Sequence, residues 1–495
     1  MDISAYEELD ALGLAELVRQ KQVSPLEVVE TAIRCIEARN PVLNAVIHTC
    51  FERAREEARR PAEGILTGVP LLLKDLLSPY AHEPHTEGSC FLKDWRPSWG
   101  GETVRRLQAA GAIILGKTNT PELGLLPYTE PECFGPTRNP WALDRTPGGS
   151  SGGSGAAVAA RMVPVATGSD GGGSIRIPSS CCGVFGLKPT RGRTPTGPVY
   201  GELWEGFLQE HVLTRSVRDS AAILDMLSPP ETGAPYRCPL PERPFLEAVS
   251  EDPPSLRIAV TTTPFMGHEV HPDCEQAVKE AALLLESLGH HVEEAAPEVD
   301  GEALAVAFVT MLIGQVAAHI QLLTELSGRT PARRYFEPTT WTLFRLGHAL
   351  PASRYTLAIH HLQQAARRIA TFFETYDLLL TPTLACPPLP IGALQPSALE
   401  KKLMKFVNTL GVTGLLQHVG LIEEIAGKTF DFIPYTPLFN ITGQPAMSVP
   451  LYWNADNLPV GVQLAARFAD EWTLLQVAGQ LERARPWHQK KPPLS

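Results

Sequence analysis

The chain has 495 residues, enough for two or three domains or for one large α/β unit at roughly 100–200 residues per domain. Lys and Arg number 43 and Asp and Glu 54, so the net charge is −11, and no stretch gathers the basic residues into a stripe. A nucleic-acid partner is therefore not expected. Apolar residues at 44% and charged residues at 20% are ordinary globular values, and they exclude a disordered, fibrous or coiled-coil protein.

Location and redox state follow from two further features. The sequence MDISAYEELDALGLAELV lacks the basic and apolar regions of a secretory signal, and the apolar runs elsewhere fall far short of a membrane span. We therefore expect a cytoplasmic protein without a membrane span. The nine cysteines are an odd number and form no CxxC motif, so reduced thiols are expected. Adjacent Cys181 and Cys182 are expected to be packing residues and not a vicinal disulfide.

The first 60 residues are predicted to be packing helices. Ser24, Pro25 and Glu27 supply an N-cap, a first-turn proline and a capping-box glutamate, and apolar residues then follow at helical spacing. From Gly64 the pattern changes to short apolar runs bounded by Gly and Pro, in GVPLLLKD and AAGAIILGKTNTPE. Such runs indicate a helix end, a buried strand and a loop, which is typical of an α/β fold.

The second half of the chain repeats this pattern. SLRIAV, from Ser255, is a predicted strand followed by a helix over 273–288, and YDLLLTPTL over 376–384 is another buried strand. Residues 305–375 and 400–430 have a mainly helical pattern. The strand pattern returns in FNITGQPAMSVPLYW and GVQLAA, before a last helix in EWTLLQVAGQLE. Because no short repeat or low-complexity linker interrupts the chain, one large domain is favoured over two.

The most informative stretch runs from Gly148 to Ser174, GGSSGGSGAAVAARMVPVATGSDGGGS. Nine of its 27 residues are glycine, where the overall composition predicts about two. A flexible linker is not expected, because the stretch passes through a small-residue helix, GAAVAAR, and a buried strand, MVPVAT. The two glycine-rich turns are therefore predicted to lie close together in space.

The second glycine cluster is predicted to bind an oxyanion. No GxxxxGK[ST] motif is present and no GxGxxG motif follows a strand, so a nucleotide-binding loop is unsupported. Glycine permits a left-handed backbone and leaves its N–H accessible, so Gly171, Gly172 and Gly173 could present successive donors. Ser174 follows where the loop enters a helix in SIRIPSSCC, at the positive end of the helix dipole, which is a suitable place for the nucleophile of acyl transfer.

A serine nucleophile needs a base, and the usual Ser-His-Asp arrangement finds little support. GSSGG over 149–153 matches GxSxG with Ser151 at its centre. That motif needs a strand before the serine, whereas the preceding LDRTPGG is polar and contains proline. None of the 14 His has a recognisable motif context, and HEVH lacks the spacing of a zinc helix, so no metal is expected.

Lysine is the alternative base. Lys74 lies in the apolar run VPLLLKDLL, where burial would lower the lysine pKa toward neutrality and let the amine accept a proton. The competing interpretation is that Lys74 pairs with Asp75 or reaches solvent at the end of a strand. The segment alone does not separate the two.

The whole stretch GGSSGGSGAAVAARMVPVATGSDGGGSIRIPS resembles the defining motif of the amidase signature family. GVPLLLKD, GKTNTPE, GLKPTRGR and FNITGQPA resemble further segments of that family, in order, over roughly residues 10–490. The resemblance implies a large mixed twisted β-sheet covered by helices on both faces. It also implies N-terminal packing helices over 1–60, a catalytic domain over 61–495, and substrate-covering segments at about 305–375 and 400–437.

The resemblance also implies the catalytic residues. Ser174 would be the nucleophile, Ser150 the cis-serine that relays the proton, and Lys74 the base. The backbone N–H groups from Gly171 to Ser174 (Gly171, Gly172, Gly173 and Ser174) would form the oxyanion hole. Neutral Lys74 would take a proton from Ser150, which takes one from Ser174, and the protons would return to the leaving nitrogen.

Three further residues are predicted to support the nucleophile. Ser151 would orient it through a hydrogen bond. Asp170 and Arg176 bracket it and are expected to pair and brace the loop, without a chemical role. Two serines and a lysine need no metal and no cofactor.

The substrate is predicted only by class. NTPE, TEPECFGPTRNPW and VFGLKPTRGR resemble the branch of 6-aminohexanoate-cyclic-dimer hydrolases, and urethane-cleaving members also look similar. We expect a small-molecule amide or carbamate substrate and a monomer or homodimer. The acyl pocket should come from four segments, Leu125–Cys133, Tyr200–Gln209, Met311–Trp341 and Met404–Pro437. Their apolar and aromatic composition suits a hydrophobic aliphatic or aryl amide.

Three alternatives stay open. The first is the glutamine-hydrolysing subunit of a tRNA-dependent amidotransferase, which shares this motif but works inside a complex. The second is an ester or carbamate hydrolase, because the same acyl-enzyme chemistry serves both. The third is a catalytically silent binding module, which intact Lys74, Ser150 and Ser174 argue against.

Overall fold

One large mixed β-sheet organises the chain, and the computed structural model describes residues 1–396, 427 and 429–494. Within these residues the sheet has eleven strands: β1 (Val46–Thr49), β2 (Pro70–Lys74), β3 (Ile113–Thr118), β4 (Val165–Asp170), β5 (Phe185–Lys188), β6 (Gln209–Thr214), β7 (Arg257–Val260), β8 (His291–Glu294), β9 (Leu378–Pro382), β10 (Ala446–Trp453) and β11 (Pro459–Ala466). Their order across the sheet is β1-β3-β2-β4-β6-β5-β10-β11-β9-β7-β8. β2 runs parallel to β3 and β4, whereas β4 is antiparallel to β6. The expected mixed α/β sheet is confirmed.

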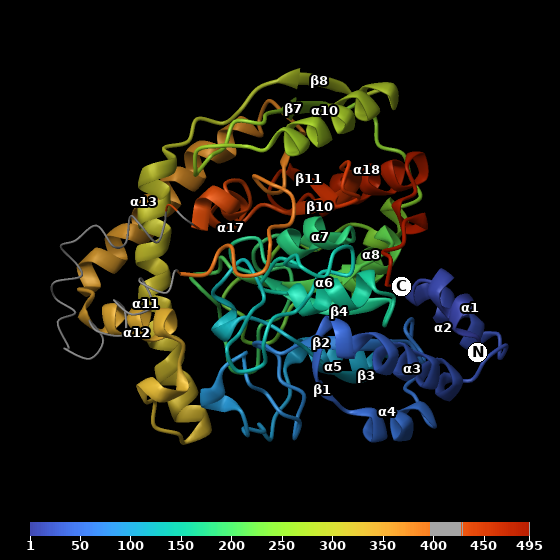
Figure 1. Ribbon diagram of the computed structural model, residues 1–495. Helices are drawn as coiled ribbons and strands as arrows, with labels where there is room; N and C mark the ends of the chain where they lie inside the picture. The colour runs from blue at the N-terminus through green and yellow to red at the C-terminus, as the bar shows by residue number, and fades with distance from the viewer. Residues whose placement is uncertain (397–426, 428, 495) are drawn as a thin grey trace.

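Helices cover both faces of this sheet (Figure 1). They are α1 (Ile3–Glu8), α2 (Ala11–Arg19), α3 (Pro25–Leu43), α4 (Phe51–Ala58), α5 (Glu102–Ala109), α6 (Gly152–Ala159), α7 (Arg176–Cys182), α8 (Val217–Leu227), α9 (Phe245–Ala248), α10 (Pro272–Ser287), α11 (Gly301–Ser327), α12 (Pro338–Ala349), α13 (Ala352–Phe372), α17 (Thr436–Thr442) and α18 (Glu471–Ala484), with short 3₁₀ turns at Cys90–Leu92, Glu122–Gly124, Arg333–Tyr335 and Trp487–Gln489. Leu379 of β9 packs in the hydrophobic cluster that contains α6 and α11, while Leu378 and Leu380 pack in the one that contains α8, α10 and α18. Because successive strand residues point to opposite faces, each face of the sheet has its own core.

Most predicted elements are confirmed near their predicted positions. Ser24 caps α3 and exchanges the two capping-box hydrogen bonds with Glu27. GVPLLLKD and SLRIAV contain β2 and β7, and the helix predicted over 273–288 is α10. Three helices, α11 to α13, occupy most of 305–375. The helical pattern predicted for 400–430 falls mainly outside the described residues.

Two predicted elements are wrong. The first 60 residues are not all helical, because Val46–Thr49 forms β1, antiparallel to β3; its four residues are too few to show a strand period in the sequence. The segment FNIT, expected in a strand, belongs to α17, which has Pro437 in its first turn and ends at Gly443 with φ of 79°. The buried amide of Asn440 in this helix donates to the backbone carbonyl of Asp170, so tertiary contacts override the β propensity of the segment.

Helix α11 corrects the expectation about apolar runs. By length and composition it could cross a membrane, with a mean hydropathy of 2.0 over its most apolar stretch. Of that stretch 61% is buried inside the protein, and α11 lies beside α12 and α13 at one side of the molecule (Figure 1). Burial accounts for its composition, since the core helix of a globular protein is apolar for the same reason.

The cysteines depart from the expected reduced state at one place. Cys90 and Cys133 form a disulfide with their Cα atoms 5.5 Å apart. They come from two loops 43 residues apart in sequence, and only the fold brings those loops together. Cys181 and Cys182 are buried free thiols, in agreement with their predicted packing role.

The parallel strands β2 and β4 bring the predicted site residues to one edge of the sheet. Lys74 is the last residue of β2 and Asp170 the last of β4, and Ser174 lies in the loop that follows β4. The carboxyl ends of parallel strands meet at the same edge, so these residues become neighbours. Ser150 lies just before α6, a helix that packs against both strands.

Candidate active site

Two serine hydroxyls hold the amine of Lys74. Its Nζ lies 2.6 Å from Ser150 Oγ and 2.8 Å from Ser169 Oγ, and all three residues are buried. The backbone N–H of Lys74 donates to Thr167 Oγ1 at 2.8 Å, which fixes the end of β2 against β4. The predicted contact between Lys74 and Ser150 is thus present.

Burial changes the acidity of Lys74. Desolvation lowers its pKa to about 7, against weaker opposing effects of the Asp170, Glu210 and Glu87 carboxylates. Among the described residues no carboxylate lies within ion-pair distance of Nζ. The competing interpretation of Lys74 is wrong, because Asp75 pairs with Lys117 at 3.2 Å and the Lys74 side chain does not reach solvent.

The peptide bond between Gly149 and Ser150 is cis, as the resemblance implied for this serine. A Cβ on Gly149 would lie 2.5 Å from the backbone nitrogen of Tyr128, so this turn needs glycine for close approach. Ser151, the centre of the rejected GxSxG interpretation, is fully buried and begins α6. Its N–H donates to the backbone carbonyl of Ser174 at 3.3 Å, which ties the two glycine-rich turns together.

Asp170 and Arg176 form the predicted brace. The Arg176 Nε and Nη2 donate to the two carboxylate oxygens of Asp170 at 2.9 and 2.8 Å, and both side chains are buried. Burial by itself would raise the pKa of Asp170, but Arg176 lowers it to about 2. Arg176 also donates to the backbone carbonyl of Thr436 and to Gln463 Oε1. The brace therefore ties the nucleophile loop to α17 and β11.

The glycine turn differs from prediction at one donor. The N–H of Gly173 donates to Asp170 Oδ1 at 2.7 Å, so it is already used by the brace. Gly173 has φ of 127°, and a Cβ there would lie 2.3 Å from Thr436 Oγ1, which explains why glycine is needed. In the described part of the chain the N–H groups of Gly171, Gly172 and Ser174 have no protein acceptor.

Ser174 lines two cavities. The larger, about 300 Å³, also contains Ser150 and Ser169 together with Gln315 and His319 of α11; we call it the relay cavity. The smaller, about 80 Å³, is the apolar cavity, and its lining residues include Leu125, Leu126, Phe308, Leu312, Leu343, Phe430 and Ile433. Gly124 and Trp204 line both cavities as well. All four segments predicted to form the acyl pocket contribute to this pair of cavities.

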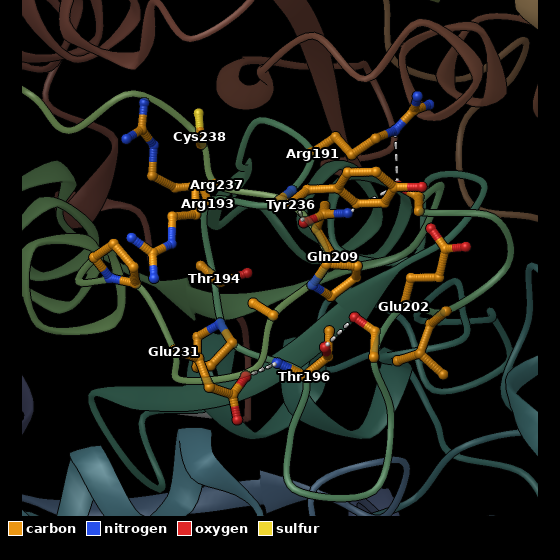
Figure 2. A pocket seen from close by; sticks show the side chains of 18 of the residues that line it. Arg191, Arg193, Thr194, Thr196, Glu202, Gln209, Glu231, Tyr236, Arg237 and Cys238 are labelled. Atoms are coloured by element: carbon orange, nitrogen blue, oxygen red, sulfur yellow. Dashed lines mark hydrogen bonds between the residues drawn. The ribbon is translucent and has the colours of Figure 1, made fainter.

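A third, smaller pocket of about 40 Å³ is lined by residues that include Arg191, Arg193 and Arg237 (Figure 2). It shares Glu202, Leu203 and Leu208 with the relay cavity. Two of its three arginines are engaged: Arg191 donates to backbone carbonyls and Arg193 pairs with buried Glu471. None of the predicted catalytic residues lines this pocket.

Sequence reasoning missed several residues around the relay. Thr167 and Ser169 are two residues apart in β4, so they point to the same face of the sheet, and both contact Lys74. Polar residues at alternate positions of a buried strand were therefore a usable signal. Glu210 of β6 pairs in register with Ser169 of the neighbouring strand β4, and it accepts a hydrogen bond from Ser78 Oγ at 2.6 Å. His319 had no local signal. Within the described chain no group of three or more His, Cys, Asp or Glu side chains could hold a metal ion.

Comparison with known proteins identifies the family of this chain. Residues 27–475 match the sequence profile of the family described as Amidase. A 6-aminohexanoate-cyclic-dimer hydrolase of Pseudomonas sp. (strain NK87) is 39% identical over 492 residues, which cover 98% of this chain and 96% of the relative. A solved structure of 6-aminohexanoate cyclic dimer hydrolase is 37% identical, covers 100% of this chain and 99% of its own, and has a TM-score of 0.90.

A more distant neighbour extends the likeness. A bacterial aryl acylamidase of the amidase signature enzymes is 28% identical, with a TM-score of 0.81 and 97% of both chains covered. The similarity spans nearly the whole chain and is not confined to one motif. The chain therefore belongs to the amidase signature family and is a hydrolase of amide carbon–nitrogen bonds.

Proposed function

We propose that this protein hydrolyses hydrophobic aliphatic or aryl amides, cyclic or linear and of the nylon-oligomer type, through an acyl-enzyme on Ser174. Lys74 acts as the base and Ser150 relays the proton. One observation carries the proposal: a fully buried lysine contacts two hydroxyls, has no carboxylate partner among the described residues, and has a pKa lowered to about 7. An amine in such surroundings is neutral in a large fraction of molecules near neutral pH and can accept a proton.

The chemistry follows from this contact. Neutral Lys74 takes the Ser150 proton while Ser150 takes the Ser174 proton, and Ser174 Oγ bonds to the carbonyl carbon. The developing oxyanion is stabilised by the free N–H groups of Gly171, Gly172 and Ser174. On collapse the carbon–nitrogen bond breaks, Ser150 passes its proton to the leaving nitrogen, and Lys74 returns its proton to Ser150. Water then gives a proton to Ser150 while Ser150 gives its own to Lys74, and the water oxygen bonds to the acyl carbon. The bond from that carbon to Ser174 Oγ breaks, the protons return through Ser150 to Ser174, and the acid is released.

The two cavities favour a particular orientation of the substrate. The leaving nitrogen must receive a proton from Ser150, and Ser150 lines only the relay cavity. The amine portion therefore occupies the relay cavity and the acyl portion the apolar cavity. The lining of the apolar cavity by Leu, Ile and Phe side chains supports a hydrophobic acyl group.

A labelling experiment tests the nucleophile. A fluorophosphonate should label Ser174 stoichiometrically, and Ser174→Ala should abolish both labelling and amide hydrolysis while the protein keeps its melting temperature. Ser151→Ala is the matched control, because Ser151 lies in the same turn region but is proposed only to orient the loop; it should still be labelled. Labelling of Ser151 in the wild type would overturn the assignment.

A substrate screen separates the alternatives left open by the sequence. Amides, esters and carbamates of one acyl group, over a range of acyl lengths, should show turnover of amides by the isolated chain. The amidotransferase alternative predicts activity confined to glutamine and dependent on partner subunits. A hydrolase that cleaves the ester and carbamate but leaves the amide intact would contradict the proposed substrate class.

A further inference from the structure

A series of buried charged groups leads from Asp75 to the wall of the relay cavity. Asp75, which follows the catalytic Lys74, lies 3.2 Å from Lys117 Nζ, and Lys117 Nζ lies 2.9 Å from His85 Nδ1. His85 Nε2 is 3.4 Å from Glu87 Oε1, and Glu87 Oε2 is 2.6 Å from Nε2 of His319. All of these groups are fully buried except His319, whose side chain is 15% exposed.

The contacts fix the protonation state of each group in this series. Lys117 is a donor and is paired with Asp75, so His85 Nδ1 must accept, and the His85 proton lies on Nε2, facing Glu87. His85 is then neutral, and burial together with Lys117 lowers its pKa. The charge of Glu87 is left with one cationic partner, His319. Burial lowers the pKa of His319, but Glu87 more than reverses this and raises the net value.

His319 lines the relay cavity and has one ring nitrogen without a protein partner. It lies on the same face of α11 as Gln315 and Leu322, which also line that cavity, and its ring centroid is 6.0 Å from that of Tyr200, another lining residue. Nε2 is held by Glu87, and Nδ1 has no protein partner among the described residues. An imidazolium with one N–H bound to a carboxylate has one N–H left to donate.

We propose that His319 is a specificity-determining residue, whose Nδ1–H donates to a hydrogen-bond acceptor, a carbonyl or carboxylate oxygen, on the amine portion of the substrate. This inference rests on the proposed function, which places the amine portion in the relay cavity. The preferred substrates are then amides whose amine portion carries a second oxygen acceptor beyond the scissile bond. The remaining wall of the cavity is mostly apolar and suits the methylene spacer between the two groups.

The direction of the hydrogen bond follows from Glu87. A histidine whose Nε2–H is bound by a carboxylate is favoured in its doubly protonated state, so Nδ1 is a donor and repels a substrate ammonium. Glu202 also lines this cavity, and its carboxylate contacts Tyr236 of the neighbouring pocket (Figure 2). An acceptor is therefore selected over a cation at His319.

Matched substrates test the proposal. Three series share one acyl group and differ in the amine: a plain alkylamine, an ω-amino primary amide and an ω-amino acid, each over a range of spacer lengths. At the best spacer length the wild type should prefer the two acceptor-bearing amines by roughly 10- to 100-fold in kcat/KM, as one charge-assisted hydrogen bond allows. The two acceptor arms distinguish a carbonyl from a carboxylate ligand.

Variants separate specificity from structure. His319→Leu should lower kcat/KM for the two acceptor-bearing series more than for the plain amide, so that the preference is lost, whereas His319→Gln, which keeps an N–H donor, should retain part of the preference. Leu322→Ala is the control on the same cavity wall, and it should change all three series by the same factor. Fluorophosphonate labelling of Ser174 and the melting temperature report whether each variant is folded.

The preference should also depend on pH. The groups that face His319 are Glu87 and, behind it, His85, together with Tyr200 and Glu202 across the cavity. The imidazolium is lost as the pH rises through its raised pKa, so the preference for acceptors should fall while hydrolysis of the plain amide rises.

Each failure has a distinct signature. If the wild type hydrolyses none of the amides, the proposed function is wrong. If it hydrolyses them and His319→Leu keeps the full preference, or loses all three series equally, the role of His319 is overturned while the proposed function stands.

Discussion

Two buried lysines lie on neighbouring parallel strands and have different partners. Lys74 ends β2 and Lys117 lies near the end of β3, paired in register with Leu73. Both are completely enclosed, and desolvation lowers the pKa of each. Around Lys74 the nearest polar atoms are the hydroxyls of Ser150 and Ser169. Around Lys117 they are a carboxylate of Asp75 and a ring nitrogen of His85.

The difference shows that burial alone does not make a base. A hydroxyl stabilises an ammonium weakly, so burial shifts Lys74 toward the neutral amine that the proposed relay needs. At Lys117 a carboxylate at 3.2 Å opposes the lowering of the pKa by burial, and the ion pair holds Asp75 in place. Adjacent residues in the sequence, Lys74 and Asp75, thus belong to two separate systems, one chemical and one structural.

Removing Lys74 should give the largest effect. Lys74→Met keeps the apolar side-chain length but removes the base, and kcat/KM should fall by on the order of 10⁴-fold with the melting temperature retained. Because Lys74 and Ser150 act as a unit, adding Ser150→Ala should cost little more. Steady-state kinetics of the two single variants and the double variant measure this; losses that multiply would argue that the two residues act independently.

Lys117→Met should instead affect stability. The substitution leaves Asp75 as an unpaired buried charge, which costs about 3–5 kcal/mol of unfolding free energy. Urea unfolding measures the loss, and the double variant Lys117→Met with Asp75→Asn should recover part of it, because no charge is then left unpaired. A full loss of activity in folded Lys117→Met protein would mean that the two lysines are not separate systems.

The pH profile of the wild type should report the neutral form of Lys74. With its pKa lowered to about 7, kcat/KM for a plain amide should fall by about tenfold per pH unit below that value and level off above it. A histidine base with an unperturbed pKa of about 6.5 would give a similar limb. Profiles of single His→Ala variants separate the two: each should keep the limb, and loss of hydrolysis in any one folded variant would falsify the lysine assignment.

The smallest expected effect is a shift of the pH midpoint at which kcat/KM rises. Glu210 is buried, accepts hydrogen bonds from Ser78 and Thr103, and its carboxylate raises the pKa of Lys74. Glu210→Gln keeps acceptor capacity but removes the charge, so the midpoint of the profile should move to lower pH, by less than about one unit. In urea unfolding, the loss of unfolding free energy caused by Lys117→Met should be the same with and without Glu210→Gln. A midpoint that moves to higher pH would contradict the sign of the coupling.

Much of the candidate site has signals in the local sequence. The glycine-rich turns from Gly148 to Ser174, the apolar run before Lys74, and the pairing of Asp170 with Arg176 all have short-range signals. Gly173 shows the limit of such reasoning, because its N–H is used by Asp170 and is no longer available to an oxyanion. Which donors of a glycine turn remain free depends on side chains that fold back onto it.

The FNIT segment and β1 show the same limit in the fold. Both are short, and their secondary-structure propensities are weak compared with the contacts they make in the folded protein. Asn440 of α17 donates a hydrogen bond to Asp170 of the brace, and β1 pairs with β3. The disulfide between Cys90 and Cys133 joins two loops that no spacing rule connects.

The sequence by itself determined the family and the α/β class and predicted the three residues of the proposed relay, because these depend on motifs and on hydrophobic periods that are local. Only the tertiary structure decided that Ser169 shares Lys74 with Ser150, that Ser174 borders two cavities, and that His319, paired with Glu87, lines one of them. These arrangements join side chains from distant segments. Their energies depend on burial and on the partner that burial imposes, and neither is encoded in any single stretch of the chain.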